Sequence, residues 1–150
     1  EKPQSNYDNY STVNCLSDLE DGFHPELVLW NDEIGISGQS DKPFLETIDG
    51  IRYADISDYK FIKKIKKVSY YNKYSREYSM LKPPLSHLMD CNWIKYNLQL
   101  SLYGWMLERA GFVVRHLGLE HNGTTHIVAY LRDEIINMLK DYKNKQHIKN

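Results

Sequence analysis

Hydrophobic and polar positions alternate along residues 24–61, and this period of two predicts β-strands. Three strands are expected in this part of the chain: residues 26–30, 34–44 and 51–61. The second strand is interrupted by Gly35 and Gly38. Residues 31–33 are expected to form the first turn, and Asp49-Gly50 is a hairpin signal for the next. The pattern therefore predicts a three-stranded meander.

Farther along the chain the period becomes helical. Apolar and aromatic residues recur every three or four positions over residues 93–110, and Gly111 follows where a C-terminal cap belongs. Two strands are then expected, over residues 112–121 and 125–131, joined at Asn122-Gly123. Asp133 is expected to cap a last helix that buries Ile135, Ile136, Leu139 and Tyr142. Together these elements predict an α/β fold with a central mixed β-sheet flanked by helices.

Two segments lack a clear period. Residues 1–23 are polar, with a short helix expected over residues 11–19. Residues 62–90 are rich in lysine and tyrosine and contain Pro83-Pro84. They are too long for a plain connection, so a functional loop or an unrecognised helix is expected there. We expect one domain over residues 1–150, with its core at about 24–145.

The overall composition is that of an ordinary globular domain. The chain has 150 residues, of which 26% are charged and 41% hydrophobic. No apolar run approaches the roughly 20 residues of a membrane span, and no secretory signal is visible, so a cytoplasmic location is expected. Cys15 and Cys91 are too few for a four-cysteine metal or iron–sulfur site, and we expect both to be reduced.

The distribution of charge is uneven. Residues 1–58 hold 13 acidic and 3 basic side chains, whereas residues 60–82 hold 8 basic and 1 acidic. This asymmetry favours a protein that holds cations in one region and phosphates in the next. Four basic side chains form a candidate nucleic-acid-binding run: Lys63, Lys64, Lys66 and Lys67. The tyrosines that follow could stack on bases, but the lysines could equally be a solvated face.

Candidate chemistry lies at the ends of the second and third predicted strands. Asp58 and Lys60 are two residues apart, so their side chains share one face of the sheet. Pairing of these strands would bring Asp41 close to Asp58. Two adjacent carboxylates repel unless a cation lies between them, and Mg²⁺ prefers such oxygen ligands. Lys60 could orient water or stabilise a phosphate. The alternative is a turn residue at Asp41 beside a surface ion pair.

The Gly38-x-x-Asp41 and Asp58-Tyr59-Lys60 patterns resemble the second and third motifs of PD-(D/E)XK nucleases. Gln99 and Tyr103, four residues apart on the predicted helix, resemble the QxxxY motif of the RecB-type and phage exonuclease branch. The resemblance covers residues 24–131. It implies a restriction-endonuclease-like core and a nuclease that hydrolyses DNA phosphodiester bonds with Mg²⁺ or Mn²⁺. An exonuclease in replication, recombination or repair is the expected type.

The resemblance also implies residue roles. Five residues would be catalytic: Asp41, Asp58, Lys60, Gln99 and Tyr103. Asp41, Asp58 and the backbone carbonyl of Tyr59 would be the metal ligands. Gln99 and Tyr103 would position Lys60, a water or the phosphate. Alternatively, Gln99 is a plain helix residue and Tyr103 a core residue.

The sequence departs from the family in two places. Phe61 follows the lysine, where the branch often has Thr or Ser. The acid or histidine of the first motif has no clear match, and we expect the helix that carries it to be incomplete in this chain. Substitutes within the chain, in order of preference, are Glu26, then His24, Glu20 and Asp21. The missing motif keeps open a catalytically silent nucleic-acid-binding module, and a restriction-like endonuclease is the other alternative.

The histidines of the second predicted hairpin are a separate question. His116, His121 and His126 lie around one hairpin, but their spacing fits no standard zinc finger. We expect them to be surface residues.

Overall fold

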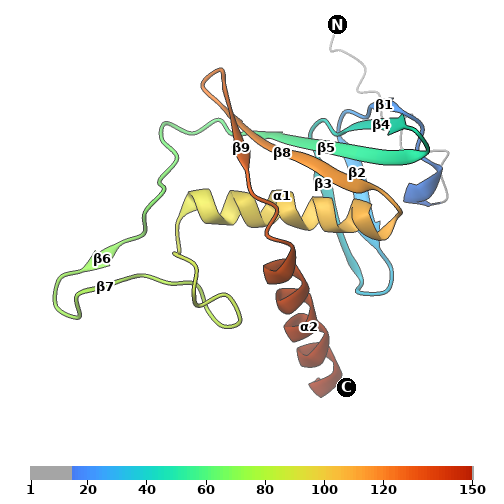
Figure 1. Cartoon of the computed structure of the whole chain (residues 1–150). Coiled ribbons are helices and arrows are strands. Elements are labelled where there is room, and N and C mark those ends of the chain that lie inside the picture. Colours follow the sequence, from blue (N-terminus) through green and yellow to red (C-terminus); the bar gives the residue numbers. More distant parts are fainter. Residues whose placement is uncertain (1–14, 150) are drawn as a thin grey trace, which may run out of the picture.

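The computed structural model describes residues 15–149 (Figure 1). Its elements in chain order are the 3₁₀ turn η2 (Leu16–Asp18), β1 (Gly22–Phe23), β2 (Leu27–Asn31), β3 (Ile36–Ser40), β4 (Phe44–Ile48), β5 (Ile51–Tyr59), β6 (Tyr71–Asn72), β7 (Glu77–Tyr78), α1 (Asn92–Arg109), β8 (Val113–His121), β9 (Thr124–Val128) and α2 (Arg132–Ile148). The fold is mixed α/β. Of the short helix expected over residues 11–19, residues 15–19 contain only η2, and residues 11–14 lie outside the described residues.

The central sheet has five strands in the order β1-β4-β5-β8-β9. β5 and β8 are parallel, and the other neighbours are antiparallel, so the sheet is mixed as expected. Parallel neighbours need a long crossover connection, and α1 lies within that connection. In Figure 1, α1 runs along one face of β5 and β8.

The predicted three-stranded meander is wrong. The expected strand over residues 34–44 is two strands, β3 and β4, separated by residues 41–43. Pro43 has no N–H to donate to a sheet, and its side chain is buried where the chain changes direction. β3 pairs with β2 in a separate two-stranded sheet. β4 pairs with β5 through Asp49-Gly50, where both residues have positive φ, as the hairpin signal predicted.

The core lies between the central sheet and α1. Ala54, Ile56 and Asp58 alternate along β5 and are all buried, so they share the face that α1 covers. Gly104 of α1 packs against β8, where an added Cβ would lie 3.2 Å from the Val114 side chain. The absence of a side chain at Gly104 therefore lets α1 approach β8 closely.

The last helix was predicted in outline. Ile135 and Leu139 are buried and Ile136 is partly buried, but Tyr142 is 40% exposed, contrary to prediction. α2 contacts α1 and then continues away from the sheet (Figure 1), and residues 142–148 are all exposed. The predicted cap is also wrong, because the N-cap residue is Leu131, whose N–H donates to the hydroxyl of Ser101 at 2.9 Å.

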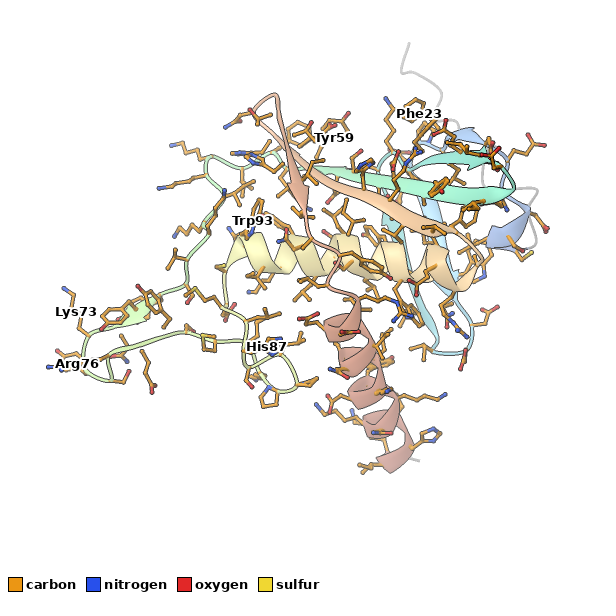
Figure 2. The ribbon with its side chains drawn as sticks, in the orientation of Figure 1. Phe23, Tyr59, Lys73, Arg76, His87 and Trp93 are labelled. Atoms are coloured by element: carbon orange, nitrogen blue, oxygen red, sulfur yellow. The ribbon has the colours of Figure 1, made fainter. Side chains whose placement is uncertain are left out.

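Residues 62–90 form an arm rather than a helix. It leaves the end of β5, carries the β6–β7 hairpin near its tip and returns to the start of α1 (Figure 1). Residues 70–80 are all exposed. Lys73 and Arg76 lie at the tip, away from the sheet (Figure 2). Within residues 15–149, neither helix has the combination of length and apolar character needed to span a membrane.

Candidate functional site

Asp41 lies in the short connection between β3 and β4. Its Oδ2 accepts a hydrogen bond from the backbone N–H of Tyr59 at 2.9 Å, and its carbonyl accepts one from the N–H of Glu26 at 2.7 Å. The sequence predicted Asp41 on the strand that pairs with β5. That placement is wrong, because Asp41 lies before β4. Its carboxylate instead reaches the last residue of β5, which still places it at the end of that strand.

Asp58 and Lys60 share one face at that end of β5. Asp58 is 6% exposed and continues the buried row of Ala54 and Ile56. Lys60 follows the strand directly, and its Nζ lies 2.6 Å from Oδ2 of Asp58. The backbone N–H of Lys60 donates to the carbonyl of Glu120 at 2.9 Å, which fixes the backbone beside β8. The ion pair is thus held at the edge of the core rather than on an open surface.

Gln99 and Tyr103 of α1 extend this arrangement. The Nζ of Lys60 donates to Oε1 of Gln99 at 3.1 Å, and Nε2 of Gln99 donates to the hydroxyl oxygen of Tyr103 at 3.0 Å. An ammonium group has only donors, so the amide oxygen must be the atom that faces Lys60. Tyr103 then accepts from the amide nitrogen and fixes the orientation of Gln99.

The side chains of Asp41 and Asp58 lie within hydrogen-bonding reach of each other. Burial, reinforced by Asp41, raises the pKa of Asp58 to about 6, although Lys60 acts in the opposite direction. Burial also acts to raise the pKa of Asp41. Hydrogen bonds from Asp58 and from the Tyr59 N–H, together with the charge of Lys60, nevertheless leave that pKa below its usual value. The pair therefore readily holds one proton between two carboxylates.

The ring of Tyr103, on α1, packs closely against β3. It is 6% exposed, and an added Cβ on Gly38 would lie only 2.7 Å from Cε1 of its ring. Burial raises the pKa of the Tyr103 hydroxyl above its usual value, despite the hydrogen bond from Gln99. Gly38 was part of the sequence pattern, and the structure supplies a reason for it: no larger residue fits without moving the ring.

The acidic pair has the donor chemistry that a hard divalent cation prefers. Two carboxylates repel each other when both are ionised, and a cation relieves the repulsion that otherwise retains a proton. Among residues 15–149 there is no group of three or more His, Cys, Asp or Glu side chains arranged to hold a metal ion. Mg²⁺ is commonly held by one or two carboxylates, with water completing its shell. The Asp41–Asp58 pair fits that mode of binding.

Tyr59 and the four lysines of the predicted nucleic-acid-binding run have different surroundings. Tyr59 contacts Asp41 through its N–H, while its side chain is 43% exposed. All four lysines are exposed on the arm: Lys63, Lys64, Lys66 and Lys67. The Nζ of Lys67 lies 4.6 Å from the ring centre of Trp93 at the start of α1. The carbonyl of Lys66 accepts from the Trp93 N–H at 3.1 Å, so the base of the arm is attached to α1.

The sequence analysis missed one aromatic neighbour. The Nζ of Lys60 lies 4.5 Å from the ring centre of Tyr96, which contributes a cation–π contact. Tyr96 precedes Gln99 by three positions, so the helical spacing alone could have placed both side chains on one face.

Two of the four substitutes for the first motif have other partners. The carboxylate of Asp21 accepts hydrogen bonds from the backbone N–H and the hydroxyl of Thr47, both at 2.8 Å. These bonds commit Asp21 to β4. His24 contacts the carbonyl of Glu20 at 2.7 Å. The side chain of Glu26 is exposed, and only its backbone contacts Asp41.

The three hairpin histidines have separate partners. His116 lies 3.1 Å from a carboxylate oxygen of Asp55, and His121 lies 2.6 Å from the carbonyl of Ile62. The ring of His126 meets that of Trp93 edge-on at a centroid distance of 5.8 Å.

No family model, curated protein or solved structure matched the chain.

Proposed function

We propose that this protein is a metal-dependent nuclease that hydrolyses DNA phosphodiester bonds, with a restriction-endonuclease-like core and exonuclease action as the expected mode. One observation carries the proposal: the carboxylates of Asp41 and Asp58 are paired, and Lys60, which Gln99 also holds, contacts Asp58. A structural ion pair would need only one carboxylate. The second carboxylate adds repulsion at a buried position, and a cation-binding role explains why both are there.

Under this proposal, Mg²⁺ or Mn²⁺ would be held by Asp41, Asp58 and the backbone carbonyl of Tyr59. A bound divalent ion supplies Lewis-acid chemistry at a phosphate, because it neutralises charge on the oxygens and activates water. The acidic pair would be fully ionised in that state. Because the pKa of Asp58 is raised, the ion would compete with a proton for this carboxylate.

In addition to the metal ion, the Lys60 side chain would supply positive charge at the site. This side chain is 18% exposed at the end of β5, so it is partly reachable from solvent. We propose that it donates to a phosphate oxygen and stabilises the additional negative charge that develops as water adds to phosphorus. The P–O bond to the leaving oxygen then breaks; the attacking water releases a proton to solvent, and the leaving oxygen takes one up.

Gln99 and Tyr103 are positioning residues in this proposal. The amide oxygen of Gln99 directs one N–H of Lys60, and Tyr103 holds that amide in place. The ring of Tyr96 restricts Lys60 from a further side. Such partners act by holding a charged group in a productive geometry, so their loss should reduce turnover more than folding stability.

The test is an activity assay with MnCl₂ or MgCl₂ on end-labelled single-stranded, linear double-stranded and circular DNA, with RNA alongside. Loss of the linear substrates but not the circular ones is the expected result. Cleavage should disappear with EDTA and in the Lys60→Ala variant. Cleavage of circular DNA would instead indicate an endonuclease.

A catalytically silent nucleic-acid-binding module is the second candidate. It is favoured by the absence, within residues 15–149, of a third acidic or histidine ligand beside the pair. DNA binding without metal-dependent cleavage of any substrate would establish it. Absence of both binding and cleavage would contradict both candidates.

A further inference from the structure

A cavity of about 590 Å³ lies beside the candidate site, between the end of β5 and the β8–β9 hairpin. Its lining includes Tyr59, Lys60 and Phe61 from one side and Glu120, His121 and Thr125 from the other. Tyr59 and Lys60 thus belong both to the cavity and to the candidate site. Figure 2 shows Tyr59 at this end of β5, beside the hairpin.

Phe61 is the most unusual residue of this cavity. It is 96% exposed, although burial of a phenylalanine side chain would stabilise the fold. It directly follows Lys60, so its ring is attached to the backbone that presents the ammonium group. Tyr59, on the other side of Lys60, is 43% exposed. Tyr59 and Phe61 are therefore two solvent-exposed aromatic residues, one on each side of Lys60 in the sequence.

The cavity has a defined wall opposite these rings. A ring nitrogen of His121 lies 2.6 Å from the carbonyl of Ile62, which holds the start of the arm against the β8–β9 hairpin. Glu120 contributes a carboxylate to the lining and lies close enough to the Tyr59 hydroxyl to raise its pKa. A carboxylate there disfavours a phosphate and favours a neutral group with N–H donors. The cavity volume is also within the range of small-molecule sites, about 300–1,000 Å³.

We propose that this cavity binds an unpaired nucleobase, stacked on Phe61, next to the phosphate held at Lys60. The inference rests on the proposed function and specifies its substrate as single-stranded nucleic acid or a frayed end. A base can enter only when it is not paired in a duplex, and aromatic stacking is the usual way in which proteins hold such bases. Lys63 and Lys64 are exposed two and three positions after Phe61. They could contact the next phosphates of the bound nucleic acid.

The test is binding measured in EDTA, so that no cleavage is required. Fluorescence anisotropy compares a fluorescein-labelled single-stranded oligodeoxynucleotide with its blunt duplex. Phe61→Leu should weaken single-strand binding about tenfold, within the range measured for loss of one stacked base. It should leave duplex binding unchanged, whereas Phe61→Tyr, which keeps the ring, should bind within about twofold of the original protein.

Phe23→Leu is the matched control. Phe23 is 60% exposed on β1 and does not line the cavity, so its replacement should leave both affinities unchanged. Because Phe61 is almost fully exposed, Phe61→Leu should melt like the original protein. A second readout places 2-aminopurine in the oligonucleotide. Its fluorescence should fall on binding and should fall less with Phe61→Leu.

Several outcomes would overturn the cavity proposal: no single-strand binding, equal binding by Phe61→Leu and the original protein, or equal losses for single strand and duplex. Binding that depends on Phe61 without cleavage under any metal condition would support the cavity and contradict the nuclease. Metal-dependent cleavage that requires Asp58 but does not depend on Phe61 would support the nuclease and contradict the cavity proposal. The two proposals can therefore fail separately.

Discussion

The Nζ of Lys60 lies 2.6 Å from Oδ2 of Asp58, at the point where β5 ends and the arm begins. Two opposing influences act on the protonation of Asp58 in this ion pair. Asp58 is buried beside Asp41 and tends to retain a proton, whereas Lys60 favours its ionised form. A cation at the pair would remove that conflict, because both carboxylates could then be ionised while Lys60 turned toward a phosphate.

Replacement of Asp58 should separate activity from folding. Asp58→Asn keeps the size of the side chain but removes its charge, so we expect cleavage to fall by at least about 100-fold, the order of loss for one charge-stabilising group. The free energy of unfolding should change little, because loss of the ion pair with Lys60 is offset by relief of the repulsion between Asp58 and Asp41. Asp49→Asn is the control, since Asp49 is exposed in the β4–β5 turn. Cleavage at the original rate by Asp58→Asn would remove Asp58 from the mechanism.

The pKa of Asp58 predicts a pH dependence of metal binding. Its folded value of about 6 lies above the ordinary 3.8, so the folded protein binds this proton more tightly than the unfolded chain. The proton thus stabilises the fold at low pH, and that contribution is lost as pH rises from about 4 through about 6. A divalent ion competes with the proton, so MnCl₂ should raise Tm more at about pH 7.5 than at about pH 5.5.

The comparison is made by melting curves with and without MnCl₂ at both pH values. Asp58→Asn should abolish the pH-dependent part of the gain. An equal increase in Tm at both pH values in the original protein would show that the ion binds elsewhere.

Gln99 should affect turnover through Lys60. Gln99→Ala removes the acceptor at 3.1 Å from Nζ, and we expect kcat to fall by roughly 10- to 100-fold, as for other positioning partners. Tyr103→Phe keeps the ring and removes the acceptor for the amide, so its effect should be smaller. Gln146→Ala, on the exposed surface of α2, is the control. Unchanged kcat in Gln99→Ala, measured with its melting curve, would contradict a positioning role.

The lysines of the arm should determine the salt dependence of binding. The combined change Lys63→Gln, Lys64→Gln and Lys66→Gln should reduce the slope of log affinity against log salt by up to about 2, since each single-strand phosphate contact contributes about 0.7. Lys67 is left unchanged because it packs over Trp93. The matched control replaces three exposed lysines at the C-terminal end: Lys140, Lys143 and Lys149. Equal slopes for both triple variants would mean that the arm lysines only solvate the surface.

Gly38 should be intolerant of a side chain because of Tyr103. A Cβ 2.7 Å from Cε1 forces the ring or β3 to move, and Gly38→Ala should cost roughly 1–3 kcal/mol of unfolding free energy. In a Tyr103→Ala background the same change should cost much less, since the obstructing ring is absent. Denaturant unfolding of the four proteins measures this coupling. Additive effects would place the strain elsewhere.

The position and type of most elements follow from local patterns. The helical period over residues 93–110 specified α1 to within one residue at each end, and the Asp49-Gly50 and Asn122-Gly123 signals marked real hairpins. The two-residue spacing of Asp58 and Lys60 sufficed to place them on one face, because side-chain direction in a strand depends only on parity. For the same reason, the four-residue spacing of Gln99 and Tyr103 placed them together on α1.

Only the tertiary structure decided how these faces meet. Alternation along residues 34–44 could not reveal that Asp41–Pro43 divides the strand, because sheet membership depends on partners distant in sequence. Asp41 reaches Asp58 through a hydrogen bond to the Tyr59 backbone, not through the predicted strand pairing. Likewise, Tyr142 is exposed because it lies on α2 beyond the turns that contact α1. Periodicity identifies the side of an element that can be buried, but the packing of the whole chain determines what lies against it.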